Sequence, residues 1–546
     1  MRKIYLIIIL ALLSQNRIFS CTNLLVGKNA STDGSTMITY SADSYSLFGE
    51  LYHYPAQKYP AGSKLKVHDW DSGKYLGEID QVSETYNVIG NMNEHQLAIS
   101  ETTFGGRAEL ENPDGIIDYG SLIYITLQRA KTAREAIKVM TDLVEKYGYF
   151  SGGESFSIAD PNEIWVMELI GKGKGIKGAV WVAVRIPDDC ITAHANQARI
   201  QQFPLNDPKN CIYSKDVISF AKEKGYFQGK DKDFSFAQAY APADFGALRY
   251  CEARVWSFFN KHGAEDMEKY VPYAMGHVKD TPMPLYMKPK QKISLKELKA
   301  MMRDHYEDTP LDWRHDIGAG PYESPYRWAP LSWEVDGTEY CNERPIATQQ
   351  AAFSFVAQMR SWLPNTVGGI LWFGMDDAGH TVYTPMYTSM TETPECFRTG
   401  NGDLYTFSWT SSFWIHNWVA NMVYPRYNQM YPDVEKVQLE LEEKFRSQTD
   451  ETDKKALSLL ESSQEEAKKF LTAYSINQAQ YAFDRWKKLG EYLMIKYMDG
   501  IVRKEENGQF KKNEFGNPDS PNRPGYSKDF YRKVIKETGD KYKVVN

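Results

Sequence analysis

Short β-rich runs that come in pairs, with a turn between the two members, constrain the fold of this chain more than any other feature. The first pair spans residues 21–27 and 35–40, and the Asp33-Gly34 step between the runs is typical of a hairpin. A second pair spans residues 86–90 and 97–102. The sequence therefore predicts β-hairpins near the start of the chain.

A helical segment and a second group of strands follow these hairpins. Residues 119–147 place apolar side chains at helical spacing. Three further β-rich runs come next, at 155–159, 164–170 and 179–186. Strand pairs, then a helix, then strand pairs predict a layered α+β fold rather than a Rossmann-like sheet.

One motif between the last two runs resembles a nucleotide-binding loop. Gly173, Gly175 and Gly178 match the pattern G-x-G-x-x-G, which binds dinucleotides where it follows a strand and opens a helix. Here the motif lies between two strand-like runs, and lysines occupy two of its positions. We therefore interpret it as a hairpin turn.

The second half of the chain changes character several times. Residues 286–345 are rich in Pro, Gly and Trp and predict long ordered loops. Residues 346–363 predict either a helix or an extended core segment, and residues 368–373 a buried strand. Residues 434–500 are dominated by Glu, Lys, Gln, Leu and Ala, which predicts a pair of helices with a solvated, charged face. The polar stretch 501–546 is expected to pack loosely.

The first twenty residues have the pattern of a signal peptide. Arg2 and Lys3 precede an apolar run at 4–13, and Ser20 is a small residue suited to cleavage. That run is too short to span a bilayer, and no later stretch reaches the roughly 20 apolar residues required. We therefore expect an exported protein without a membrane span. The chain then divides into a signal peptide (1–20), a main domain (21–433), a helical extension (434–500) and a polar tail (501–546).

Charge and missing motifs exclude several functional classes. The 546 residues carry a formal net charge of −7, and no basic block stands out. Nucleic acid and anionic membrane surfaces are therefore not expected as partners. The sequence contains no H-E-x-x-H, G-x-S-x-G or Walker motif, which leaves the commonest metallo-, serine- and nucleotide-hydrolase mechanisms without support.

The Ser20–Cys21 junction is the most informative site in the sequence. A cysteine that becomes the first residue can attack a carbonyl while its own α-amine accepts the thiol proton, because an α-amine titrates near about 7.7–8.0 and a thiol near about 8.5. Alternatively, Cys21 is lipidated as a membrane anchor. Phe19 is bulkier than the residues that precede a lipoprotein cysteine, which weakens that alternative.

Five other cysteines accompany Cys21. If Cys21 stays free, at most two disulfides can form. Cys341 and Cys396 both lie in polar, loop-like surroundings, and we expect these two to pair.

The segment Cys21-Thr-Asn-Leu-Leu-Val-Gly-Lys-Asn-Ala-Ser-Thr-Asp-Gly-Ser-Thr-Met-Ile, followed by Asp43, carries a resemblance to a known family. It is similar to the start of the dipeptidase A family, cysteine peptidases of the N-terminal-nucleophile (Ntn) hydrolase superfamily and relatives of penicillin V acylase and bile salt hydrolase. Further similar segments follow in the family's order, at 93–94, 98–103, 127–136, 153–160, 195–200, 253–256, 347–350 and 358–360. Together they cover roughly residues 21–430.

The resemblance implies a fold and a set of site residues. The expected fold is an αββα sandwich of four layers, with the nucleophile Cys21 at the tip of the first strand and a helical segment added at the C-terminus. Asp43 would orient the amine or thiol of Cys21. Asn196 would donate to the oxyanion of the intermediate, and Thr103 would contribute a backbone N–H there. Arg254 would keep the surroundings of the nucleophile electropositive and lower its pKa.

The chain departs from the family pattern at one position. Many members carry Arg three residues before the aspartate, where this chain has Tyr40. A tyrosine hydroxyl donates a hydrogen bond but supplies no fixed positive charge, which makes Arg254 or another arginine more important. A papain-like alternative would use His194, two residues before Asn196, as the base.

These residues predict an exported cysteine dipeptidase that cleaves short peptides without a metal or organic cofactor. Two alternatives share parts of the argument. An amidohydrolase of the penicillin or bile-acid acylase type would use the same catalytic residues on a different acyl group. A lipid-anchored binding protein with an inactive site would carry an acylated Cys21.

Overall fold

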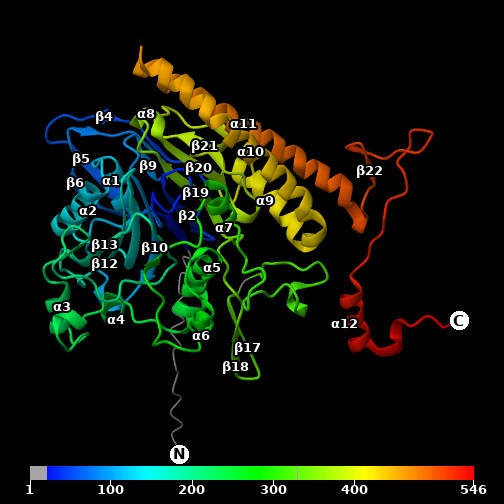
Figure 1. Cartoon of the computed structure of the whole chain (residues 1–546), viewed down its shortest axis with the longest axis horizontal. Helices are drawn as coiled ribbons and strands as arrows, with labels where there is room; N and C mark the ends of the chain where they lie inside the picture. Colours follow the sequence, from blue (N-terminus) through cyan, green and yellow to red (C-terminus); the bar gives the residue numbers. More distant parts are fainter. Residues whose placement is uncertain (1–20, 329, 546) are drawn as a thin grey trace, which may run out of the picture.

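The computed structural model describes residues 21–328 and 330–545. The predicted signal peptide lies outside the described residues. Two antiparallel sheets dominate the molecule, and helices lie against their outer faces (Figure 1). The α+β class predicted from the sequence is therefore confirmed.

The first sheet has seven strands in the order β16-β14-β1-β2-β19-β20-β21. These strands are β1 (Asn23–Val26), β2 (Thr36–Asp43), β14 (Ile191–His194), β16 (Tyr286–Met287), β19 (Ala351–Met359), β20 (Gly369–Met375) and β21 (Thr384–Tyr387). β1 and β2 form the predicted hairpin, and every residue of both strands is buried. Within residues 346–363, Ala351–Met359 form the strand β19 and not a helix, which suits their central place in the sheet.

The second sheet has eight strands in the order β15-β13-β12-β11-β10-β9-β8-β3. These strands are β3 (His53–Tyr54), β8 (Val88–Ile89), β9 (Met92–Asn93), β10 (Ala98–Gly105), β11 (Gly153–Ala159), β12 (Ile164–Gly171), β13 (Ala179–Ile186) and β15 (Cys211–Tyr213). The second predicted pair does not form a simple two-stranded hairpin. The short strand β9 lies between β8 and β10 and pairs with both. The G-x-G-x-x-G motif joins β12 to β13 as a turn, as predicted.

Alternation along the strands of the second sheet explains the layers, because successive side chains point to opposite faces. In β12, Ile164, Val166 and Ile170 belong to the core shared with the first sheet. Trp165, Met167 and Leu169 belong to a separate core. Helices α1 (Tyr119–Leu127) and α2 (Ala133–Tyr147) complete that second core.

The sequence predicted a single helical stretch over 119–147, but the structure divides it in two. Thr132 begins α2 by accepting a hydrogen bond from the backbone N–H of Glu135 at 3.3 Å. Asp118 caps α1 in the same way, through Gly120 and Ser121. Each helix therefore has its own N-terminal cap, a side-chain acceptor for otherwise unpaired N–H groups.

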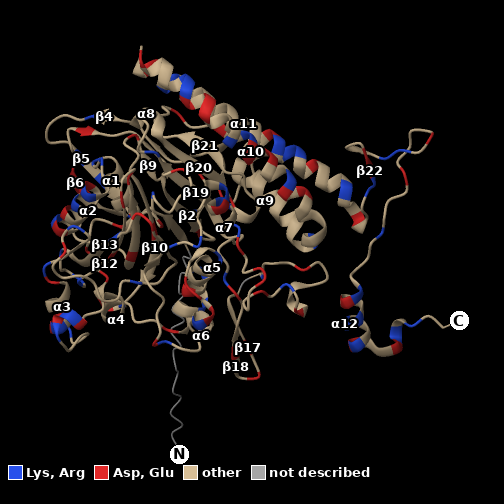
Figure 2. Ribbon diagram, viewed as in Figure 1, with Lys and Arg blue, Asp and Glu red and all other residues tan. Residues whose placement is uncertain are grey.

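Long helices cover the outer face of the first sheet. They are α9 (Ser412–Val423), α10 (Tyr427–Leu460) and α11 (Gln464–Tyr497). The last two run side by side across the edge that ends in β21 (Figure 1). Figure 2 shows charges of both signs along their outer surface, as the composition of 434–500 predicts. A buried ion pair from Arg360 at the end of β19 to Asp453 of α10 joins the two layers, so these helices are an integral part of the core.

Smaller elements fill the connections. They are β4 (Gln57–Lys58), β5 (Lys64–His68), β6 (Tyr75–Asp80), β7 (Glu84–Thr85), α3 (Val217–Glu223), α4 (Phe236–Tyr240), α5 (Ala253–His262), α6 (Val271–Ala274), α7 (Leu295–Met301) and α8 (Asn365–Gly368). Beyond α11, the hairpin β22 (Glu505–Glu506) and β23 (Gln509–Phe510) and helix α12 (Lys528–Thr538) are largely exposed. Among the described helices, none combines the length and apolar character needed to cross a membrane.

The expected Cys341–Cys396 disulfide is wrong, because all six cysteines are free thiols. Cys341 ends the hairpin of β17 (Ser332–Val335) and β18 (Thr338–Cys341), whose other residues are exposed. Cys396 is buried in the main core. The polar neighbours of both residues in the sequence conceal this difference in environment.

Candidate active site

Cys21 lies immediately before β1, and strand register determines its neighbours. β1 pairs with β14 so that Asn23 faces His194, and continuing this register by two residues brings Cys21 opposite Asn196. On the other side, Thr22 bridges to Ser41 of β2. Cys21 is only 5% exposed. The sheet therefore holds the thiol inside the molecule, between the ends of two neighbouring strands.

The thiol contacts Tyr40, which leads to the second sheet. Cys21 Sγ lies 3.6 Å from the hydroxyl of Tyr40, and that hydroxyl donates to Glu101 Oε1 at 2.6 Å. Glu101 belongs to β10, and its main-chain carbonyl accepts a hydrogen bond from Asn23 Nδ2 at 2.6 Å. The site is thus built between the two sheets.

A second buried carboxyl lies beside Glu101. Register places Thr103 directly opposite Glu154 of β11, and Glu101, two residues earlier, shares their face of the sheet. Thr103 Oγ1 donates to Glu154 Oε1 at 2.7 Å. Burial raises the pKa of Glu101 to about 6, and burial together with Glu101 raises the pKa of Glu154 well above its usual value. Burial and the charge of Glu101 thus favour the protonated form of Glu154.

The groups around Cys21 change the acidity expected for its thiol. Burial raises the pKa of Cys21 well above its usual value, and the negative charges of Glu101 and Asp43 add to the rise. Hydrogen bonding to the backbone N–H of Asp43 and to Tyr40 acts in the opposite direction. Burial and the two carboxylates are thus the main influences on this pKa, and the expectation that Arg254 lowers it stays a prediction. Burial and these carboxylates therefore favour the thiol over the thiolate.

Arg254 instead holds the main chain around Cys21. Its Nη1 donates to the carbonyl of Cys21 at 2.6 Å and to Thr22 Oγ1 at 2.7 Å, and its Nη2 donates to Ala195 O and Asn196 Oδ1. Its Nε donates to Tyr250 O, within the π-helical turn that precedes α5. The side chain is completely buried. All five N–H groups of the guanidinium are thus used, and none is directed at the thiol.

Asn196 has an unusual backbone conformation next to the nucleophile. Its φ of 61° lies in the left-handed region, which asparagine tolerates better than most residues. Its Oδ1 accepts from Arg254, and its Nδ2 donates to the carbonyl of Thr103 at 2.8 Å. That bond uses one of the two N–H groups of the amide, and the other is the one an oxyanion would take.

Asp43 ends β2 and is paired with a cation that the sequence analysis did not identify. Ser41 Oγ and Arg344 Nη2 each donate to its carboxylate at 2.5 Å. Arg344 is 1% exposed and lies in the connection before β19. Burial raises the pKa of Asp43, and the charge of Arg344 opposes that rise.

His194 has a structural environment. Its Nδ1 lies 2.7 Å from Thr102 Oγ1, and its Nε2 lies 2.7 Å from Ser157 Oγ. Burial lowers its pKa to about 3, so the ring is neutral. Neither nitrogen is left to act on Cys21, which removes the geometric basis of the papain-like alternative.

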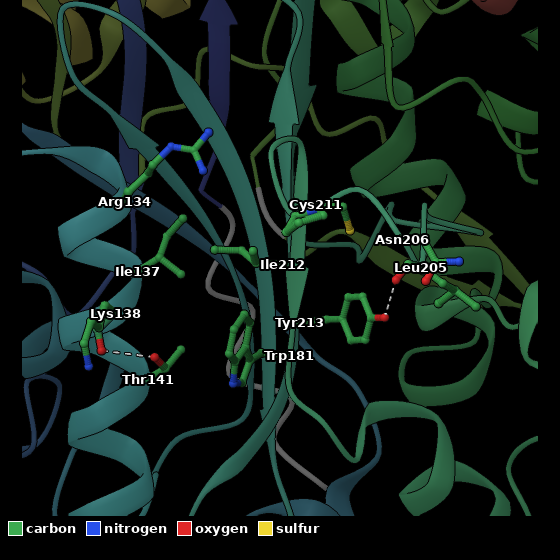
Figure 3. A pocket seen from close by; sticks show the side chains of 11 residues that line it. Arg134, Ile137, Lys138, Thr141, Trp181, Leu205, Asn206, Cys211, Ile212 and Tyr213 are labelled. Atoms are coloured by element: carbon green, nitrogen blue, oxygen red, sulfur yellow. Dashed lines mark hydrogen bonds between the residues drawn. The ribbon is translucent and has the colours of Figure 1, made fainter.

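Two cavities differ in their relation to Cys21. A cavity of about 40 Å³, lined by aromatic residues that include Tyr40, Trp70, Tyr119 and Phe353, adjoins the site. A groove of about 670 Å³ lies elsewhere, between α2 and the edge strand β15 (Figure 3). No residue that lines this larger groove contacts Cys21. Within residues 21–328 and 330–545, no group of His, Cys, Asp and Glu side chains is arranged to hold a metal ion.

The structure brings all five residues named from the sequence into one region. Asn196 and Arg254 are joined to each other and to Cys21 and Thr103 by direct hydrogen bonds, and Asp43 contacts the thiol through its backbone N–H. Their chemical roles remain predictions.

Sequence reasoning missed the roles of Glu101, Glu154 and Arg344. The two glutamates have a recognisable signal, because each interrupts a run that is otherwise typical of a buried strand. A charged residue is rarely fully buried without a partner. Arg344 has no such signal, since it lies in the connection between β18 and β19, whose path only the folded chain reveals.

Comparison with known proteins identifies the family of the chain. The family model of peptidase family C69 matches residues 20–53 and 48–440. A "Probable dipeptidase" of Salmonella dublin is 28% identical over 422 residues, which cover 71% of this chain and 85% of that protein. A "Probable dipeptidase" of Latilactobacillus sakei is 25% identical over 430 residues, covering 75% and 82%. "Dipeptidase A" of Lactobacillus helveticus is 26% identical over 429 residues, covering 74% and 81%.

The match begins beside Cys21 and runs through both sheets, all five residues named from the sequence and the start of α10. A match over this much of the chain shows the family: the protein belongs to peptidase family C69.

Proposed function

We propose that this protein is an exported cysteine dipeptidase of the Ntn type, with Cys21 as its nucleophile. Removal of residues 1–20 would make Cys21 the first residue and free its α-amine. The layered arrangement of helices, two sheets and helices supports assignment to the Ntn superfamily. The names of the relatives support a dipeptide substrate.

One observation carries the mechanism. Cys21 is a buried residue whose surroundings favour the neutral thiol, Arg254 fixes its carbonyl, and neither nitrogen of His194 is free to serve as its base. A neutral thiol must lose its proton as it attacks, so a base must lie within reach. The α-amine of Cys21 itself is attached two bonds from Cβ and fulfils this requirement.

The reaction then proceeds in two steps. The α-amine takes the thiol proton while sulfur bonds to the scissile carbonyl carbon, whose oxygen becomes an oxyanion. The free N–H of Asn196 Nδ2 stabilises that oxyanion, an effect worth about 3 kcal/mol for one such donor. Collapse breaks the C–N bond, and the α-ammonium returns its proton to the leaving amine. Water, deprotonated by the same amine, then hydrolyses the thioester and regenerates the thiol.

The test compares protein that begins at Cys21 with protein that retains an N-terminal extension. Mass spectrometry establishes each N-terminus, and hydrolysis is measured on dipeptides, penicillin V and glycine-conjugated bile acids. We expect dipeptide cleavage only by the form with a free Cys21 amine, since an amide has no useful basicity. Preference for penicillin V or a bile acid would instead assign an acylase, and an acylated Cys21 would assign the lipid-anchored alternative.

Substitution of the nucleophile sharpens this test. Cys21→Ser should lose at least 100-fold in kcat, because the α-amine is too weak a base to activate an alcohol. Cys211→Ser is the matched control, since it removes another buried thiol that lies outside the site. Full dipeptide turnover in Cys21→Ser would place the nucleophile elsewhere.

A further inference from the structure

The acidic side of the site contains two carboxyls that the proposed reaction does not use. Glu101 and Glu154 are 1% and 0% exposed. Within the described chain, neither forms an ion pair with Lys, Arg or His. Their Oε1 atoms accept from Tyr40 and Thr103, while both Oε2 atoms are buried without a hydrogen-bond donor from another residue type.

Such a pair is suited to receive a cation. Buried carboxylates are costly unless a counter-charge or a proton neutralises them. Here a proton favoured on Glu154 does so at rest. An ammonium group carries three N–H donors and a positive charge, and can replace that proton.

The position of Glu101 and Glu154 near Cys21 matches the place of the substrate's α-ammonium group. In a dipeptide, the α-ammonium nitrogen is two bonds from the scissile carbonyl carbon. Whatever binds this ammonium must therefore lie within a few ångströms of the attacking sulfur. Glu101 satisfies this requirement, because Tyr40 bridges its carboxylate to Cys21 Sγ.

We propose that Glu101 and Glu154 together bind the free α-ammonium group of the substrate's N-terminal residue, and so restrict cleavage to peptides with an unblocked N-terminus beside the scissile bond. This inference rests on the proposed dipeptidase function. On binding, the ammonium takes the place of the proton that the pair holds, and that proton leaves to solvent. The cation also offsets the negative field at Cys21, so the substrate itself favours loss of the thiol proton.

The experiment uses two substrates that differ in one group. L-alanyl-L-alanine carries the α-ammonium, and N-propionyl-L-alanine has hydrogen in its place. We expect wild-type mature protein to prefer the dipeptide at least 100-fold in kcat/KM, because a buried polar site rejects an analogue that leaves it unpaired. Equal cleavage of the two by wild type would overturn the inference without any variant.

Variants of Glu101 and Glu154 then test whether this pair causes the preference for the dipeptide. Glu154→Gln and Glu101→Gln should each lower kcat/KM for the dipeptide at least tenfold, mainly through KM, and change that for the propionyl compound less than threefold. Glu168→Gln is the control: this buried glutamate of β12 accepts from the backbone N–H groups of Arg199 and Ile200, and both substrates should respond alike. Equal losses on both substrates in the Glu101 and Glu154 variants would reduce the pair to a structural role.

Failure of this inference is distinct from failure of the proposed function. If wild type cleaves dipeptides but the variants do not change the substrate preference, only the assignment of Glu101 and Glu154 fails. If wild type cleaves neither substrate and acts on penicillin V or a bile acid conjugate, the dipeptidase proposal fails first.

Discussion

The hydrogen-bonding groups on the two sides of Cys21 differ in how completely they are paired. On the main-chain side, Arg254 uses all five of its N–H groups on fixed acceptors. On the thiol side, Tyr40 leads to Glu101 and Glu154, which retain acceptor atoms without a donor from another residue type. A saturated network fixes geometry, whereas an unsaturated one can accept a ligand. The difference separates the part of the site that positions the nucleophile from the part that meets the substrate.

The largest effect should follow from removing the hydrogen bonds that Arg254 makes on the main-chain side of Cys21. Arg254→Gln removes several hydrogen bonds to buried acceptors, each of which costs about 1–3 kcal/mol when left unpaired. We expect a loss of about 3 kcal/mol or more in the free energy of unfolding, and at least a 100-fold loss of kcat. Denaturant unfolding and steady-state kinetics measure the two quantities.

The matched control for Arg254 is Arg134→Gln on α2. Arg134 is partly exposed and pairs with Glu163, so its loss should cost less than about 1 kcal/mol. If Arg254→Gln were as mild as Arg134→Gln, the saturated network would not be what holds the nucleophile.

A smaller effect, which depends on pH, should appear when Glu101 on the thiol side is changed. The pKa of Glu101 is raised to about 6 in the folded protein, so the folded state binds a proton that an unfolded glutamate releases near pH 4.5. The stabilisation from this carboxyl is complete below that value and is lost as pH rises through 6. A shift of this size corresponds to about 2 kcal/mol.

Glu101→Gln should therefore lack this part of the decline in unfolding free energy between pH 4.5 and pH 8. Wild type and Glu101→Gln are compared by denaturant unfolding at both pH values. A difference between them that stays constant with pH would show that the carboxyl does not take up a proton on folding.

The smallest effect should come from Tyr40, which lies between the two carboxyls and the thiol. Its hydrogen bond lowers the pKa of Cys21, so Tyr40→Phe should raise that pKa further and slow alkylation of the thiol by iodoacetamide, by less than tenfold. Tyr40→Arg should have the opposite sign, because it adds a positive charge. Peptide-level mass spectrometry after timed alkylation at several pH values isolates Cys21 from the other thiols. Identical profiles in all three proteins would separate Tyr40 from the chemistry of the nucleophile.

Sequence patterns predicted the local elements well where one physical cause dominated. The Asp33-Gly34 turn predicted the β1–β2 hairpin, and the β-rich run at residues 164–170 predicted the strand β12. Residues 346–363 left helix and strand open, because a fully buried strand in the middle of a sheet has no polar alternation to distinguish it. The break between α1 and α2 depends on capping by Asp118 and Thr132, which the periodicity of the apolar residues does not reveal.

The candidate site was predictable to the extent that it resembled known motifs. Cys21, Asn196 and Arg254 lie in such motifs, and the structure brings them together. Their electrostatic surroundings were not predictable, because the charge at Cys21 depends on which residues of the second sheet face it. Glu101 and Arg344 reach the site from β10 and from the connection before β19, and only the packing of the sheets brings them there.

The attachment of Arg254 to the carbonyl of Cys21, and not to its nitrogen, has a consequence for maturation. Cleavage of the 20–21 bond alters one atom of Cys21, its nitrogen, and leaves the carbonyl, Thr22 and Asn196 untouched. On the proposed route, the precursor therefore already holds its nucleophile in the working position and lacks only a basic amine. Processing would then act as a chemical switch on a finished scaffold, and the interval between cleavage and full activity would be set by the protease and not by any refolding of the enzyme.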